Sequence, residues 1–389
     1  MNFRESLYID KTIVKNTGFN PYYRQVETGL GKRMIIEGQS FISLGSNDYL
    51  GIANSEELKS AAKEALNKYG ISMCSTSIVT GYTKLTKDLE DKTAEFLKQE
   101  EALIFPSGYQ ANLSIFQLLT NKEDAIIADR YAHASLIQGT QLSRANLFRF
   151  PHNDMKKLEK FLSNSQNCRM RFIVVDGLYS TEGDIALLDK IVELAKKYKA
   201  FTVVDDAHGI GVLGNTGRGS FEMFNVLGKI DLISGSFGKA FGCTGGFIAT
   251  NHKVADFFRY RCGPLIYSTA LPPVLIASII VAIDLIEKST ERRKMLVQNK
   301  ETLYTALKGM GYPLTNSITP LFSIISKEAQ KIIELARDLY KKGIYATPFI
   351  PPSVPEGHSC LRCIPHANLE KEDINYIINT FTELKNIYI

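Results

Sequence analysis

The stretch RFIVVDGLYSTEGDIALLDKIVELAKKYKAFTVVDDA, residues 171–207, decides the fold class of this chain. Residues 171–177 and 201–207 are short apolar runs rich in β-branched side chains, and residues 187–198 between them have the apolar spacing of a helix. Strands that are apolar along their whole length are buried on both faces. A helix that joins two such strands predicts a parallel pair within an α/β sheet.

The same alternation extends in both directions along the chain. Further strand candidates and the helical patterns that follow three of them lie at 102–105, 109–120, 125–129, 133–142, 147–150, 154–162 and 231–237. The whole pattern predicts a mostly parallel central sheet with helices on both faces. In such sheets the functional residues lie beyond the carboxyl ends of the strands, so the chemistry is expected there.

The pattern changes near residue 272. A long helical stretch runs from there to about residue 308, and shorter strand and helix patterns follow it, which predicts a smaller C-terminal α+β domain. We therefore expect an N-terminal arm at 1–45, a large α/β domain at 46–285 and a small domain at 286–389.

Composition and charge argue against several classes of protein. The 46 basic and 41 acidic residues are interspersed and leave a net charge of +5, so no nucleic-acid partner is expected. The most apolar stretch, residues 271–286, contains two prolines and Asp284, and it is too short to span a bilayer. The N-terminus MNFRESLYIDK does not resemble a signal peptide, and a cytoplasmic location is expected.

The cysteines do not indicate a metal site. Cys360 and Cys363 form a lone CxxC motif, and no second pair of cysteines accompanies it. A structural zinc site needs four ligands, so no metal is expected.

The segment SGSFGKAFGCTGG, residues 234–246, surrounds Lys239 with small residues, which leaves room for a bulky group close to the backbone. A phosphate-binding P-loop would need glycine at Ile233 and serine or threonine at Ala240, so that motif fails. The run GIGVLG at 209–214 precedes a turn rather than a helix, so it lacks the anion site of a dinucleotide fold.

A lysine that binds an aldehyde cofactor fits this segment better. Pyridoxal phosphate also needs a carboxylate against its pyridine nitrogen, and Asp205 and Asp206 end a strand candidate. Side chains alternate across a strand, so one of the two is expected to face the site. The phosphate needs donors, which a helix start at Gly108 and Tyr109 would supply.

Motifs in chain order resemble those of the α-oxoamine synthases. They are SNDYLG (46–51), SGYQAN (107–112), HAS (133–135), DDAHGIGVLG (205–214), GSFGKAFG (235–242), IYSTALPP (266–273), PPSVPEG (351–357) and LR (361–362). The resemblance extends from about residue 20 to the C-terminus. It implies a fold-type I pyridoxal phosphate transferase with a central sheet of the seven-stranded type. The implied reaction is decarboxylative condensation of a small amino acid with an acyl thioester, which releases CoA and CO₂.

The resemblance also implies roles for the matching residues. Lys239 would carry the cofactor as a Schiff base and act as general acid–base, and Asp205 would pair with the pyridine nitrogen. His133 would stack on the ring, and His208 would lie near the phenolic oxygen. The other expected cofactor-binding residues are Ser107, Gly108, Tyr109, Asp176, Ser180, Ser236 and Thr269.

Substrate binding and assembly follow from the same resemblance. Asn47 and Arg362 would orient the carboxylate of the amino acid, and Arg24 would lie near the acyl substrate. A planar guanidinium suits a carboxylate because it can bind both oxygens. Thr269 would reach the phosphate in a neighbouring subunit, so a homodimer with shared sites is expected.

The substrates stay open at this level. The motifs favour the branch that joins alanine to a pimeloyl thioester, carried by CoA or a carrier protein, in biotin biosynthesis. Thr86 and Ile350 stand where that branch usually has histidine and arginine. Serine palmitoyltransferase, long-chain aminoketone synthases and 2-amino-3-ketobutyrate CoA ligase remain alternatives within the family. An aminotransferase or a lyase on the same fold, and a protein without catalytic activity, are alternatives of another class.

Overall fold

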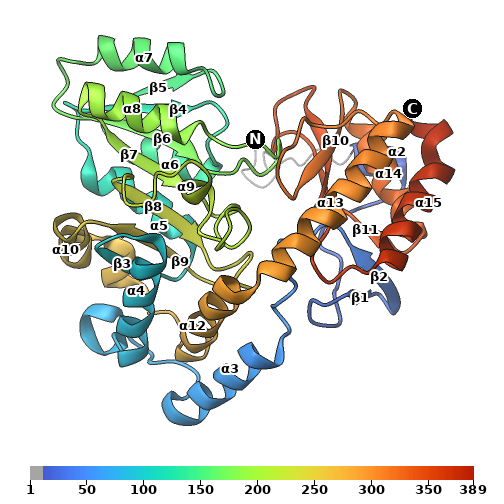
Figure 1. The fold of residues 1–389 in the computed structure, drawn as a ribbon, viewed down its shortest axis with the longest axis horizontal. Coiled ribbons are helices and arrows are strands. Elements are labelled where there is room, and N and C mark those ends of the chain that lie inside the picture. The colour runs from blue at the N-terminus through green and yellow to red at the C-terminus, as the bar shows by residue number, and fades with distance from the viewer. Residues whose placement is uncertain (1–11) are drawn as a thin grey trace, which may run out of the picture. The chain divides into compact units, whose positions relative to one another are not determined.

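The computed structural model describes residues 12–389, which divide into two compact units (Figure 1). The large unit comprises Asn47–Ser180 and Asp184–Met295. The small unit comprises residues 12–46 together with Thr181–Gly183 and Leu296–Ile389.

The first boundary of this division lies one residue from the expected one, whereas the second boundary and the place of the N-terminal segment differ. The segment expected as an N-terminal arm belongs to the small unit, because β1 (Arg33–Ile36) and β2 (Gln39–Ser43) form a sheet with β11 (Ile344–Tyr345). The boundary expected at 285/286 falls at 295/296, inside the helix α13 (Thr290–Met310). A pairing between strands that lie 300 residues apart leaves no local signal in the sequence.

The large unit is built on a seven-stranded sheet with the order β3-β9-β8-β7-β6-β4-β5. The strands are β3 (Glu101–Phe105), β4 (Ala125–Asp129), β5 (Asn146–Phe150), β6 (Arg171–Asp176), β7 (Phe201–Asp205), β8 (Leu232–Ser236) and β9 (Gly246–Thr250). The five strands from β8 to β5 are parallel, and β9 is antiparallel to both of its neighbours. The predicted fold class is confirmed, but β9 was not predicted.

The register of the sheet aligns the ends of the central strands. Asp176 at the end of β6 is paired with Asp205 at the end of β7, and Asp205 is paired in turn with Ser234 of β8. Asp176 and Asp205 therefore reach the same edge of the sheet, where parallel α/β proteins place their ligands.

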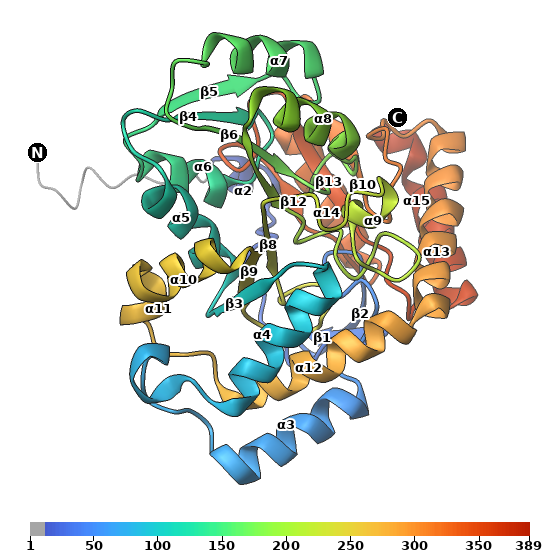
Figure 2. The ribbon, with the colours of Figure 1, turned by 60° about the vertical axis from the view of Figure 1, so that its left-hand side comes forward.

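Helices cover both faces of this sheet (Figure 2). Phe172 and Val174 pack in one apolar cluster with side chains from α5, α6, α10 and α11, whereas the alternate residues Ile173 and Val175 are buried on the other face, where α8 contacts β7. The helices of the large unit are α3 (Glu56–Tyr69), η1 (Ser77–Gly81), α4 (Lys84–Leu97), α5 (Gly108–Leu119), α6 (Ala134–Gln141), α7 (Met155–Asn164), α8 (Leu188–Tyr198), α9 (Ser220–Met223), α10 (His252–Arg261), α11 (Gly263–Tyr267) and α12 (Pro273–Lys288).

The small unit has the α+β character that its sequence predicts. Two three-stranded sheets, β1-β2-β11 and β10-β13-β12, pack with helices around an apolar cluster that includes Phe322, Ile333 and Phe381. The elements not yet given are α2 (Thr12–Thr17), β10 (Phe322–Ser326), α14 (Ala329–Lys341), β12 (Pro348–Phe349), β13 (Ser359–Cys363) and α15 (Lys371–Tyr388).

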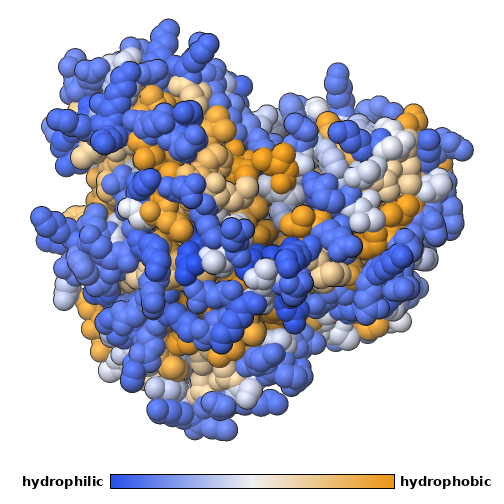
Figure 3. Space-filling view, viewed as in Figure 1, coloured by the Kyte–Doolittle hydropathy of each residue, from blue (hydrophilic) through white to orange (hydrophobic). Residues whose placement is uncertain are grey.

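Hydrophilic side chains dominate the face of the molecule shown in Figure 3. Within residues 12–389, no helix has the length and apolar character needed to cross a membrane.

Cys360 and Cys363 are buried on β13, and burial raises the pKa of their thiols to about 11 and about 12.

Gly246, the first residue of β9, allows two backbone segments to approach closely beside the site. A Cβ at this position would lie 2.2 Å from the backbone nitrogen of Gly108 and 2.4 Å from its Cα. Both atoms are backbone at the start of α5, so they cannot move aside. We expect Gly246→Ala to lower the free energy of unfolding by about 3 kcal/mol, measured by urea denaturation.

Gly309 in α13 provides the matched control. A Cβ there would meet nothing within 4 Å, and Gly309→Ala should stabilise the helix by about 0.5–1 kcal/mol. An unfolding free energy of Gly246→Ala equal to that of the parent would contradict the close approach.

Candidate active site

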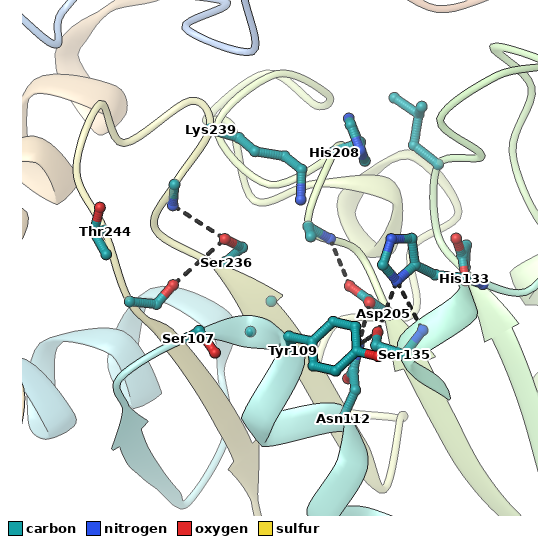
Figure 4. A pocket seen from close by; sticks show the side chains of 17 residues that line it. Ser107, Tyr109, Asn112, His133, Ser135, Asp205, His208, Ser236, Lys239 and Thr244 are labelled. Carbon is teal, nitrogen blue, oxygen red and sulfur yellow. Dashed lines mark hydrogen bonds between the residues drawn. The ribbon is translucent and has the colours of Figure 1, made fainter. Parts of the chain in front are cut away.

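A cavity of about 280 Å³ lies in the large unit at the carboxyl ends of β6, β7 and β8 (Figure 4). It is lined by Ser107, Gly108, Tyr109, Asn112, His133, Ser135, Asp176, Leu178, Asp205, Ala207, His208, Gly235, Ser236, Gly238, Lys239, Thr244 and Gly245. The location agrees with the expectation from the topology of the sheet.

Most of the cofactor-binding residues expected from the sequence meet in this cavity. They are Ser107, Gly108, Tyr109, His133, Asp176, Asp205, His208, Ser236 and Lys239. The side chain of Lys239 extends into the cavity from the segment between β8 and β9 (Figure 4). Ser180, Thr269 and Asn47 lie outside the lining.

The two arginines expected at the substrate belong to the small unit. The guanidinium of Arg24 lies 3.1 Å from a carboxylate oxygen of Glu37 and 5.0 Å from the ring centroids of Phe19 and Tyr340. The guanidinium of Arg362, on β13, lies 4.7 Å from the ring centroid of Phe349. Their roles toward a substrate stay predictions.

Asp205 and Asp206 face different surroundings, as strand alternation predicts. Asp205 lines the cavity, and its Oδ2 accepts a hydrogen bond of 2.6 Å from Nδ2 of Asn112. Asp206 instead accepts hydrogen bonds from the backbone nitrogen and the hydroxyl of Ser220, at 2.7 and 2.9 Å. Burial raises the pKa of Asp206 to about 7. Asp205 is therefore the carboxylate available to a ligand.

A chain of hydrogen bonds connects Asp205 to His133. Nδ2 of Asn112 also lies 2.9 Å from the hydroxyl of Ser135, and that hydroxyl lies 2.7 Å from Nδ1 of His133. Burial lowers the pKa of His133, an effect that Asp205 opposes and Lys239 reinforces. The ring is thus neutral at physiological pH, which suits a flat surface for packing against another ring.

Asp176 completes this wall of the cavity. Its Oδ1 accepts a hydrogen bond of 3.0 Å from the backbone nitrogen of His133. Burial and the nearby charge of Asp205 raise the pKa of Asp176 well above its ordinary value. One negative charge in this pair is therefore favoured over two.

The opposite side of the cavity suits an anion. Ser107 is the N-cap of α5 and accepts from the backbone nitrogen of Gln110, and the first N–H groups of a helix have no acceptor within it. The hydroxyl of Ser236 accepts a hydrogen bond of 3.1 Å from the backbone nitrogen of Gly238. A Cβ at Gly108 would lie 3.0 Å from the carbonyl oxygen of Gly235, which explains the glycine at this helix start.

Three residues that sequence reasoning missed contribute to the site. Asn112 and Ser135 lie within quoted motifs. Gly108 and Asn112 are four residues apart, so they lie on one face of a helix, and this spacing could have placed Asn112 near the site. Tyr49 also lies within a quoted motif, SNDYLG, but no local spacing relates it to the site. Its hydroxyl lies 2.8 Å from Nδ1 of His208, and both residues are buried. That contact holds the imidazole of His208 at the wall of the cavity.

These observations test whether the cavity fits pyridoxal phosphate. It contains an amine, a buried carboxylate, a flat neutral ring and an anion-binding helix start. Those four features match the aldehyde, the pyridine nitrogen, the ring face and the phosphate of the cofactor. The residues present therefore fit the group.

Comparisons with known proteins agree with the geometry. Residues 39–381 match the family model described as aminotransferase class I and II. The chain belongs to this family. The 8-amino-7-oxononanoate synthase of Thermoanaerobacter pseudethanolicus is 38% identical over 372 residues, 95% of this chain and 94% of the relative. The 8-amino-7-oxononanoate synthase 2 of Bacillus subtilis is 37% identical over 377 residues, 97% of this chain and 96% of the relative.

Solved structures narrow the class further. Serine palmitoyltransferase of Sphingomonas wittichii superposes with a TM-score of 0.92 at 31% identity, covering 97% of this chain and 96% of that one. The 8-amino-7-oxononanoate synthase of Francisella tularensis has a TM-score of 0.77 at 30% identity, covering 90% of this chain and 99% of that one. Within the larger family, these relatives confirm that the chain is an α-oxoamine synthase, as its motifs predicted.

Proposed function

We propose that this protein is a pyridoxal phosphate-dependent acyltransferase that condenses alanine with a pimeloyl thioester. The products are 8-amino-7-oxononanoate, CO₂ and the released thiol, which is CoA or a carrier protein. The observation that carries the proposal is the meeting of Lys239 and Asp205 in one cavity. The sequence similarity supports the same reaction, because this chain is 36–39% identical over most of its length to curated 8-amino-7-oxononanoate synthases.

The residues of the cavity would hold the cofactor by its four features. Lys239 Nζ would bind the aldehyde carbon, and Asp205 would keep a proton on the pyridine nitrogen. The neutral ring of His133 would cover one face, and His208 would lie near the phenolic oxygen. Ser107, Gly108, Tyr109 and Ser236 would bind the phosphate. When bound, pyridoxal phosphate supplies a conjugated ring that takes up the electron pair left on the substrate's Cα.

Two side chains would then move or hold protons during the reaction. Lys239 Nζ would remove the proton from Cα of alanine and later return one. Asp205 accepts from Asn112 at 2.6 Å and from the backbone nitrogen of Ala207 at 3.0 Å, and these contacts would hold its carboxylate in place. Burial and the charge of Asp205 raise the pKa of Asp176 beside it, which favours the neutral form of that carboxyl.

Substrate recognition completes the proposal. Asn47 and the fork of Arg362 would bind the carboxylate of the amino acid, and Arg24 would lie near the acyl chain. Ser180, two residues beyond the lining residue Leu178, would contribute to the cofactor site. The supporting argument is the motif match at each position.

We also propose a cytoplasmic homodimer in which Thr269 reaches the phosphate of the neighbouring subunit. All six cysteines are thiols, as expected in a reducing compartment. Three apolar side chains near one another on η1 and α11 are largely exposed, Ile78 at 51%, Val79 at 72% and Tyr267 at 85%. Exposed apolar groups of this kind favour a second chain as a cover.

Light scattering after size exclusion should give twice the 43.5 kDa of one chain. Val79→Glu should weaken the dimer, because it would place a charge in a desolvated interface. Val297→Glu on α13, where the valine is 47% exposed, is the matched control and should leave the mass unchanged. A monomeric parent would contradict the proposed assembly.

A panel of substrates tests the reaction. Alanine, serine and glycine are each combined with acetyl-, pimeloyl- and palmitoyl-CoA, and the release of CoA is measured. The proposal predicts the highest kcat/KM for alanine with pimeloyl-CoA. If no pair releases CoA, and no thiol is released from a pimeloyl carrier protein, the result would favour an aminotransferase or a lyase.

One observation favours serine palmitoyltransferase as a second candidate. The solved serine palmitoyltransferase of Sphingomonas wittichii superposes on this chain with a TM-score of 0.92, whereas the 8-amino-7-oxononanoate synthase of Francisella tularensis gives 0.77.

Thr86, one of the two residues that depart from the proposed branch, has a local structural role. It completes a capping box with Thr83 at the start of α4. Higher kcat/KM for serine with palmitoyl-CoA would select the second candidate.

A further inference from the structure

His152, which follows β5 in the chain, lies between two carboxylates. Its Nδ1 is 3.0 Å from Oδ1 of Asp129, and its Nε2 is 2.8 Å from Oδ2 of Asp184. Asp129 is fully buried at the end of β4, and Asp184 belongs to the loop after β6. An imidazole that faces an ionised carboxylate at each nitrogen donates from both and therefore carries a positive charge.

Tyr131, Tyr179 and Asn153 hold His152 in this arrangement. The ring of His152 stacks on Tyr131 at 4.6 Å between centroids and meets the edge of Tyr179 at 4.4 Å. The backbone nitrogen of Asn153 donates to Oδ2 of Asp129 at 3.0 Å, and its Nδ2 donates to the carbonyl oxygen of Ile185 at 3.0 Å. Residues 152 and 153 thus contact both the segment after β4 and the loop after β6.

Each of these two segments carries a wall of the cavity. The segment after β4 leads to His133, and Asp129 also accepts from the backbone nitrogen of Tyr131 at 2.8 Å. The loop after β6 carries Leu178, and the carbonyl oxygen of Asp184 accepts from the backbone nitrogen of Tyr179 at 3.0 Å. His152 itself lies outside the lining of the cavity.

We propose that His152 is a positioning residue that clamps the segment 129–133 to the loop 177–185 and thereby holds His133 and Leu178 at the cavity. It touches neither the cofactor nor the substrates. The consequence for catalysis rests on the proposed function, in which His133 packs on the cofactor, whereas the clamp itself rests on the contacts alone.

The electrostatics support a clamp that is closed at neutral pH. Burial would lower the pKa of His152, but hydrogen bonds and charge from Asp129 and Asp184 together raise it to about 10. The charge of Asp176 on β6 also acts on Tyr179, and Arg149 on β5 interacts with Asp129. Because the folded pKa lies above the ordinary value of about 6.5, the stabilisation is complete below pH 6.5. It is lost as the pH rises through 10.

The test uses the full chain, with and without added pyridoxal phosphate. His152→Phe keeps a flat ring between the tyrosines and removes both donors. Without the cofactor, amide hydrogen exchange at residues 130–133 and 177–180 should become about tenfold faster, the effect of losing a hydrogen bond to a charged group. The dissociation constant of pyridoxal phosphate should rise by a similar factor. Exchange in β8 should stay unchanged.

Two further variants keep the test decisive. Asp184→Asn removes one charge at a residue that is partly exposed, so we expect it to fold even if His152→Phe does not. It should accelerate exchange in the same two segments. His252→Phe is the matched control, because His252 also contacts a carboxylate, 3.1 Å away on Glu101, but is exposed. It should change neither exchange nor cofactor affinity.

The pH profile separates the clamp from a general structural role. The difference in exchange between the parent and His152→Phe should be largest at pH 6 and shrink toward pH 10. Unchanged exchange in both variants, or a difference independent of pH, would overturn the clamp. A parent that binds no pyridoxal phosphate would instead overturn the proposed function, and the exchange measurement would still report on the clamp.

Discussion

Lys239→Ala is expected to lose turnover by roughly four to six powers of ten while it stays folded. The variant has no amine in the cavity to bind the cofactor's aldehyde or to remove the proton from the substrate's Cα. The fold should survive because the residue lies in a segment between β8 and β9 rather than in the apolar cluster of the large unit. CoA release measures the turnover, and circular dichroism measures the fold.

Two comparisons sharpen this experiment. Lys253→Ala, at an exposed lysine on α10, should retain the activity of the parent. A small primary amine such as ethylamine, added to Lys239→Ala, should restore part of the turnover because it replaces the missing proton acceptor. Turnover of Lys239→Ala within about tenfold of the parent would refute the role of this lysine.

Asp205→Asn should lower kcat by roughly three powers of ten and weaken the binding of pyridoxal phosphate. An amide has no negative charge to keep the pyridine nitrogen protonated, so the ring would take up electrons less well. The geometry of the cavity should change little. The remaining amide oxygen can still accept one of the hydrogen bonds that Asn112 and the backbone nitrogen of Ala207 donate to Asp205.

The neighbouring carboxylate gives the matched control for this variant. Asp206 is buried as well, but it bonds to Ser220 on the other side of the strand. Asp206→Asn should therefore keep the turnover per folded molecule, even where it changes stability. Equal losses in the two variants would show that the charge at Asp205 has no special role. The absorbance of the bound cofactor reports its protonation in each case.

The local elements of the sheet could be predicted because each has its own pattern. The expected strand, helix and strand at 171–177, 187–198 and 201–207 appear as Arg171–Asp176, Leu188–Tyr198 and Phe201–Asp205. Strand β9 was missed because it begins at Gly246, directly after the glycine-rich segment that surrounds Lys239. The pairing of β2 with β11 was missed because no local pattern records contacts between distant segments.

The candidate site divides in the same way. His133 and Asp205 could be expected at one place because both follow strands of a parallel sheet, whose ends share an edge. The contact of Tyr49 with His208 spans 159 residues, and the two carboxylates at His152 come from the end of β4 and from the loop after β6. Such contacts depend on packing in three dimensions, which the spacing of residues along the chain does not show.

The most direct measurement of the central claim is the position at which the cofactor binds covalently. The protein is saturated with pyridoxal phosphate, reduced with borohydride, digested and analysed by mass spectrometry. We predict a single modified peptide that carries the added mass on Lys239. Modification at a different lysine, or no modification of a protein that turns over its substrates, would contradict the account.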